Sequence, residues 1–144
     1  MTTTPSPTKD AASTLEPARW SVAGQFLESL SARDYERMAT TLAQNARLRA
    51  LLPGGSSEWH GRADISDTFA SWYGSAEDFE VVDATVGEVA RRLLMTWRIR
   101  VRPAPYEIGD GWHLIEQHAF ADVSDAIEAL DLVCSGFRIE RTNQ

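Results

Sequence analysis

Cysteine is almost missing from this chain of 144 residues, because Cys134 is its single representative. No disulfide can form within the chain, and a domain of this length buries about two thirds of its unfolded surface without one. So little cysteine is typical of a reducing compartment, and we expect a cytoplasmic protein. We expect Cys134 itself to be a buried, inert thiol, because no histidine is paired with it in the sequence.

Positive charge and long apolar runs are also scarce. Lys and Arg number 14 against 21 Asp and Glu, which gives a net charge of -7 and a pI near 4.9. This balance argues against nucleic acid and anionic membranes as partners, and runs such as Leu93–Met95 are too short to span a bilayer. Residues 1–17 are rich in Thr, Ser and Pro and lack a signal peptide's apolar region. We expect residues 1–17 to form a flexible arm and residues 18–144 a single domain.

Ligand sets for metals and phosphates are not recognisable either. His60, His113 and His118 share no metal-ligand spacing, and alternation places His113 and His118 on opposite faces of one strand. The glycine-containing segment 52–56 lacks the lysine and the following helix of a phosphate-binding loop. We therefore expect no metal site.

Three segments show helical periodicity. Apolar residues recur at three- and four-residue steps from Trp20, Asp34 can cap a second helix, and a third lies between Gly61 and Gly74. The apolar stripes are Trp20, Ala23, Phe26, Leu27 and Leu30; Tyr35, Met38, Ala39 and Leu42; and Ile65, Phe69, Trp72 and Tyr73.

The rest of the chain is typical of β-strands. The predicted strands are 47–52, a short piece at 57–60, 79–87, 91–102, 112–122 and 126–140, with the tip of one connection at 109–111. Helix, helix, strand and helix followed by four strands indicate an α+β fold. We expect the three helices to cover one face of a strongly curved mixed or antiparallel sheet, with a ligand cavity between them.

Four stretches carry a family resemblance: FLESLSARDYERMATTLAQNARL, GRADISDTFASWYG, WHLIEQHAFADV and AIEALDLVCSGF. Their order and spacing, from Trp20 to Phe137, resemble the SnoaL-like branch of the nuclear transport factor 2-like superfamily. The resemblance implies a cone-shaped α+β barrel and a homodimer. Members of the branch include polyketide cyclases, ketosteroid isomerase-like enzymes, small epoxide hydrolases and dehydratases, which use acid–base groups and no cofactor. Other members only bind or dimerise.

The resemblance directs attention to the strand 112–122. Alternation puts Trp112, Leu114, Glu116, His118 and Phe120 on one face, which the resemblance places inside the cone. Glu116 then stands where a ketosteroid isomerase carries an oxyanion-stabilising carboxylic acid, and desolvation would raise its pKa. His118 would be its partner in proton transfer. The alternatives are a solvated, outward Glu116 and a histidine hydrogen-bonded at the pocket wall.

Asp131 is the third catalytic candidate. It matches the position of the proposed catalytic acid or base of SnoaL-like cyclases, although Leu130 replaces their usual tryptophan. A carboxylate among apolar residues needs a partner, for which His118 or an arginine would serve. The alternative is a structural ion pair.

The predicted pocket combines aromatic and small apolar side chains. Its residues are Phe26, Ala50, Trp72, Tyr73, Trp97, Trp112, Phe120 and Val133. Phe26 and Ala50 stand where a ketosteroid isomerase has its oxyanion-hole tyrosine and general-base aspartate, so that machinery is not expected here. The aromatic residues could stack on a flat ligand or simply form the core.

Two functions therefore remain open. The first is a cofactor-independent cyclase, isomerase or dehydratase (a lyase) acting on a hydrophobic small molecule, such as a polyketide-type intermediate of natural-product biosynthesis. The second is a non-catalytic small-molecule-binding or dimerisation module of the same fold. A solvent-facing Glu116 would favour the second.

Overall fold

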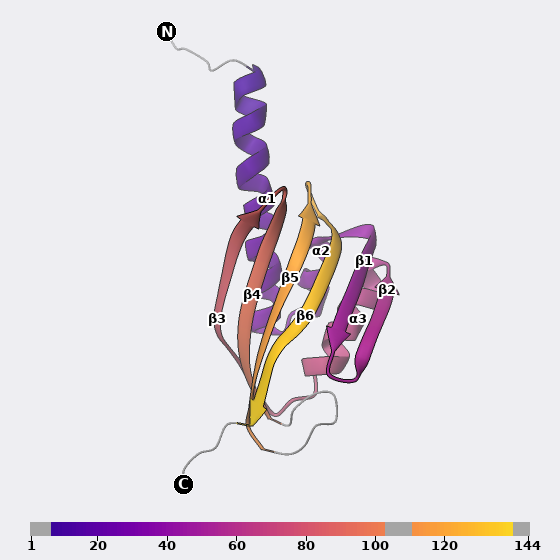
Figure 1. Cartoon of the computed structure of the whole chain (residues 1–144). Coiled ribbons are helices and arrows are strands. Elements are labelled where there is room, and N and C mark those ends of the chain that lie inside the picture. Colours follow the sequence, from indigo (N-terminus) through magenta and orange to yellow (C-terminus); the bar gives the residue numbers. More distant parts are fainter. Residues whose placement is uncertain (1–6, 103–110, 140–144) are drawn as a thin grey trace.

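The computed structural model describes the backbone of residues 7–102 and 111–139, and the side chains of residues 18–102 and 111–136 (Figure 1). The helices are α1 (Pro7–Ala32), α2 (Tyr35–Thr40) and α3 (Arg62–Tyr73). The strands are β1 (Leu42–Leu52), β2 (Gly55–His60), β3 (Asp78–Val89), β4 (Arg92–Arg102), β5 (His113–Val123) and β6 (Ile127–Ile139). The predicted tip of the connection between β4 and β5 lies outside the described residues, apart from Gly111.

Helix α1 begins well before the expected start at Trp20. It starts at Pro7, and its first turns extend past the end of the sheet (Figure 1). Proline suits the first turn of a helix because it has no amide hydrogen to bond there. Residues 7–17 are therefore helical, while residues 1–6 of the expected arm lie outside the described part. Residues 7–17 have no sustained series of apolar residues at helical steps, which is why periodicity did not predict this part of the helix.

The other two helices begin where the sequence predicts. Asp34 caps α2, with its side chain accepting a hydrogen bond from the backbone nitrogen of Arg37 at 3.1 Å. Gly61 precedes α3 with a φ of 95°, a left-handed conformation that glycine adopts without steric cost.

The six strands form one mixed sheet in the order β2-β1-β6-β5-β4-β3. Strands β1 and β6 are parallel, whereas the other neighbours are antiparallel. The three helices lie on one face of this sheet, behind it in Figure 1. The fold is thus the expected α+β arrangement, and the sheet is not closed.

The core lies between the helices and the sheet. The inner residues of β4 alternate as predicted, and Leu93, Met95, Trp97, Ile99 and Val101 are all buried. Aromatic rings from the helices fill the space above them, with ring centroids 5.6 Å apart for Phe26 and Phe69 and 6.2 Å apart for Phe26 and Trp97. No described element covers the opposite side of the sheet, which we call the outer face.

Candidate functional site

The two faces of β5 are placed opposite to expectation. His113, Ile115, Gln117, Ala119 and Ala121 point into the core and are buried. Glu116 and His118 lie on the outer face instead. The Glu116 side chain is 36% exposed, and its Oε2 lies 3.9 Å from Nη1 of Arg98. The prediction that the cone encloses Glu116 is therefore wrong, although its catalytic role stays a prediction.

The residue that decides this orientation is Gln117. Its Oε1 accepts hydrogen bonds from Oη of Tyr73 at 3.0 Å and from Nε1 of Trp97 at 2.8 Å. Buried donors need acceptors, and Gln117 meets this need in an otherwise apolar interior. Gln117 was not among the predicted site residues, because its partners Tyr73 and Trp97 come from other elements and meet it only in the folded chain.

The predicted pocket residues do not form one pocket. Five of them lie in or against the core: Phe26, Ala50, Trp72, Tyr73 and Trp97. Three lie on the outer face, namely Trp112, Phe120 and Val133. The Trp112 ring lies 4.5 Å from the guanidinium of Arg100 and 4.9 Å from that of Arg102. For Trp72 and Trp97, the interpretation as core residues is therefore the better supported one.

A groove on the outer face gathers four of the predicted residues, Ala50, Phe120, Asp131 and Val133. Its volume is about 660 Å³, which is in the range of small-molecule sites. We call it the Asp131 groove; its lining is Arg49, Ala50, Leu51, Ser56, Ser57, Glu58, Arg92, Phe120, Asp131, Leu132 and Val133. A second hollow, of about 410 Å³, shares Phe120 and contains Glu116 and His118. The catalytic candidates are thus divided between two neighbouring hollows.

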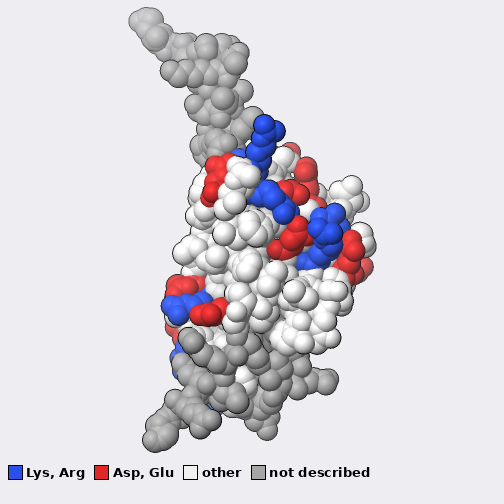
Figure 2. All heavy atoms as spheres, viewed as in Figure 1, with Lys and Arg blue, Asp and Glu red and all other residues white. Residues whose placement is uncertain are grey.

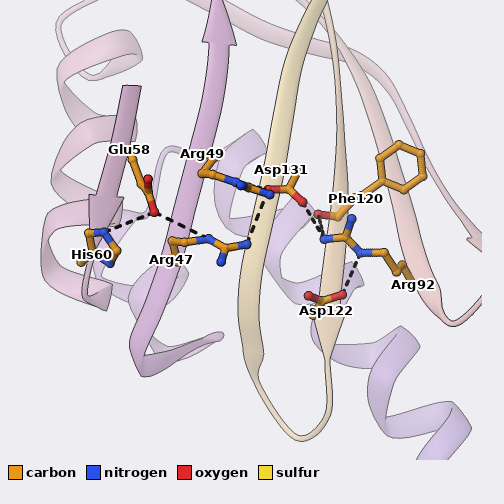
Figure 3. A network of polar contacts seen from close by, with 8 residues as sticks. All are labelled: Arg47, Arg49, Glu58, His60, Arg92, Phe120, Asp122 and Asp131. Carbon is orange, nitrogen blue, oxygen red and sulfur yellow. Dashed lines mark hydrogen bonds and ion pairs between the residues drawn. The ribbon is translucent and has the colours of Figure 1, made fainter. Parts of the chain in front are cut away.

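Asp131 lies at the centre of an ion-pair network in this groove (Figure 3). Its Oδ1 accepts a hydrogen bond from Nε of Arg49 at 3.0 Å, and its Oδ2 accepts one from Nη2 of Arg92 at 2.9 Å. Arg47 adds a third cation at 3.7 Å, and Arg92 also donates from Nε to Asp122 at 2.7 Å. Arg49 is in reach because β1 runs parallel to β6 with Arg49 opposite Asp131.

These contacts determine the charge state of Asp131. Burial raises the pKa of this carboxyl group, but the hydrogen bonds from Arg49 and Arg92 outweigh it and hold the pKa below its usual value. Asp131 is therefore a carboxylate at neutral pH and has no proton to donate there. Of the two expected partners, arginine is the one found, while the ring of His118 contacts Phe120 at a centroid distance of 6.1 Å.

Cys134 packs against the core on the opposite side of β6 from Asp131. Burial raises the pKa of its thiol, which keeps it protonated and unreactive at neutral pH. In the part of the chain that the structure describes, no group of three or more His, Cys, Asp or Glu side chains could hold a metal ion. None of the helices described is long and apolar enough to cross a membrane.

Several solved structures share this fold. A provisionally assigned polyketide cyclase from Xanthomonas campestris is 17% identical, with a TM-score of 0.65 over 81% of this chain and 90% of that one. A phenazine biosynthesis-related protein from Pseudomonas aeruginosa is 10% identical, with a TM-score of 0.71 over 88% and 79% of the two chains. A provisionally assigned ketosteroid isomerase from Kribbella flavida is 19% identical, with a TM-score of 0.54 over 90% and 85%.

At these identities the solved structures establish the fold alone. No curated protein matches the sequence. The sequence pattern of the SnoaL-like domain, however, matches residues 23–127, which is most of the chain. The protein therefore belongs to the SnoaL-like domain family.

Proposed function

We propose that this protein is a small-molecule-binding member of its family and that its ligand occupies the Asp131 groove. The observation that carries the proposal is the groove itself, a ligand-sized hollow of about 660 Å³ lined by both apolar and polar residues. Leu51, Phe120 and Val133 supply apolar surface, and Ser56, which lies beside Leu51 on the same face of the sheet, supplies a hydroxyl group for hydrogen bonding. A hydrophobic molecule with one polar end suits this lining.

Binding is favoured over acid–base catalysis because the catalytic candidates are not enclosed. A carboxyl group that donates a proton near neutral pH needs an apolar, desolvated site. The buried polar side chains in the described part of the chain are Ser29, Thr41, Ser66, Thr68, His113 and Gln117, and none of these is a carboxyl group. Glu116 is on the outer face, and arginines keep Asp131 ionised. A cyclase, isomerase or dehydratase mechanism therefore lacks its expected acid.

A neutral fluorescent probe tests the groove. We expect N-phenyl-1-naphthylamine to bind the wild-type protein and to bind Phe120→Ala about tenfold more weakly, because the variant loses the ring that forms one apolar wall. Fluorescence titration gives both dissociation constants. Trp112→Ala is the matched control, since Trp112 is an aromatic residue of the same outer face but outside the groove. Equal weakening by both substitutions would contradict binding in the groove.

Pairing of two chains through the outer face is a second candidate function. Figure 2 shows uncharged surface between two charged clusters on this face. Outer-facing uncharged residues of β4 and β5 that lie outside the Asp131 groove include Leu94, Thr96, Leu114 and His118. Such a face can pack on its own copy about a two-fold axis, which is the commonest form of homodimer.

Sedimentation equilibrium tests the homodimer. We expect the wild-type protein to sediment as a dimer and Leu114→Glu as a monomer, because a buried unpaired carboxylate at the interface is unfavourable. Leu114 lines neither hollow, so the monomeric variant should still bind the naphthylamine probe. A monomeric wild-type protein would rule out pairing while leaving the binding proposal intact.

A further inference from the structure

Arg49 is positioned to bind a negatively charged group in the Asp131 groove. Its Nε donates to Asp131, and this is the only atom of its guanidinium with a hydrogen-bond partner among the described residues. The side chain is 57% exposed and lines the groove. Both Nη nitrogens are therefore available to a ligand, and they present the planar fork that matches a carboxylate or phosphate.

Asp131 fixes this fork in place. It holds the Nε side of Arg49, as Figure 3 shows, and leaves the opposite edge of the guanidinium open. A side chain that is already oriented loses less conformational entropy when it binds. The other two arginines of the network each contact two carboxylates, because Arg92 also bonds Asp122, and Arg47 lies 3.7 Å from Asp131 and 3.9 Å from Glu58.

The remaining carboxylate of the groove does not block this site. Glu58 lines the groove, but its Oε2 lies 3.3 Å from Nε2 of His60 and 3.9 Å from Nε of Arg47. This oxygen is thus engaged by His60 of β2 and Arg47 of β1, as Figure 3 shows. Ser56 lies beside Leu51 in the register of β1 and β2, two residues along β1 from Arg49 and on the same face of the sheet.

We infer that the ligand is an anionic amphiphile whose carboxylate, sulfonate or phosphate group binds the free edge of Arg49. Its apolar body then lies along Leu51, Phe120 and Val133. The inference rests on the proposed function, because it assigns the ligand class of the same groove. It makes Arg49 the residue that selects acids over neutral molecules of the same shape.

Two probes with one ring system separate the inference from the proposed function. 8-Anilinonaphthalene-1-sulfonate carries an anionic group, and N-phenyl-1-naphthylamine is the same molecule without it. We expect Arg49→Gln to weaken the sulfonate about tenfold and to leave the neutral probe unchanged, because a charge-assisted hydrogen bond is lost. Arg49→Lys should restore part of the affinity. Arg62→Gln, which removes an exposed arginine on α3, should change neither probe.

Each outcome has one meaning. If Arg49→Gln leaves the ratio of the two affinities unchanged, the anionic site is overturned while the groove stands. If neither probe binds the wild-type protein, the proposed function fails, and the inference fails with it. Competition against the sulfonate by 1-naphthoate or by 1-naphthyl phosphate identifies the preferred acid, whereas equal competition by naphthalene would overturn the inference. Urea unfolding verifies that every variant is folded.

Discussion

Gln117→Leu is expected to lower the free energy of unfolding by about 3 kcal/mol. Leucine has nearly the same volume, so the core stays filled. The buried Oη of Tyr73 and Nε1 of Trp97, however, lose their shared acceptor. A buried donor deprived of its acceptor costs about 1–3 kcal/mol, and two donors are affected here. Urea unfolding followed by tryptophan fluorescence measures the change.

Glu116→Leu is the matched control, because it makes the same substitution one residue away on the outer face. We expect it to change stability by less than about 1 kcal/mol, since the Glu116 side chain is 36% exposed. A larger loss for Glu116→Leu than for Gln117→Leu would mean that the faces of β5 are reversed.

Asp131→Asn should lower stability by about 1–2 kcal/mol at pH 7, and this loss should shrink as the pH falls below the ordinary carboxyl pKa of 3.8. We expect so small a loss because solvent screens a partly exposed ion pair. The carboxyl group has a lower pKa in the folded protein than the ordinary value of 3.8. It therefore stabilises the fold fully above that value, and the contribution disappears as the pH falls through the folded pKa.

Unfolding midpoints of wild type and Asp131→Asn across this pH range measure the contribution. Asp122→Asn is the control, because Arg92 is the one ion-pair partner of Asp122 among the described residues and the Asp122 side chain is 47% exposed. Asp122→Asn should lower stability at pH 7 by less than Asp131→Asn does. A difference between wild type and Asp131→Asn that stays constant down to pH 2 would show that the ion pairs do not stabilise the fold.

The sequence predicts best where one signal is local and unambiguous. Strand β4 has apolar residues at every second position, and these are the residues that face the core. The cap at Asp34 and the glycine at position 61 locate the starts of α2 and α3 for the same reason. Each of these features depends on residues within one element, so no knowledge of tertiary structure was needed.

Strand β5 shows what local patterning cannot decide. Trp112, Leu114 and Phe120 make its outer face look apolar, while His113 and Gln117 make its inner face look polar. Which face of β5 enters the core depends on Tyr73, which donates a hydrogen bond to Gln117 and is 44 residues away from it in the sequence. A polar residue belongs in a core when distant partners satisfy it, and those partners become visible only in the folded chain.

The partners of Asp131 were unpredictable for a similar reason. An arginine was one of the two expected partners, yet Arg49 is 82 residues away and Arg92 is 39 residues away. Arg49 meets Asp131 because β1 lies parallel to β6, next to it in the sheet, whereas Arg92 reaches it from β4 across β5. Period-two alternation assigns residues to faces but gives no strand order, so the groove could not be assembled from the sequence.

The location of the bound ligand is the most direct test of the account. Nitrogen-15 NMR of the protein titrated with 8-anilinonaphthalene-1-sulfonate reports on both sides of the sheet at once. We predict shifts of the Nε–H signals of Arg49 and Arg92 and of the Val133 amide, with the indole signal of Trp97 unchanged. Shifts confined to the Trp97 indole and the Gln117 side-chain amide would place the ligand between the helices and the sheet and contradict a site on the outer face.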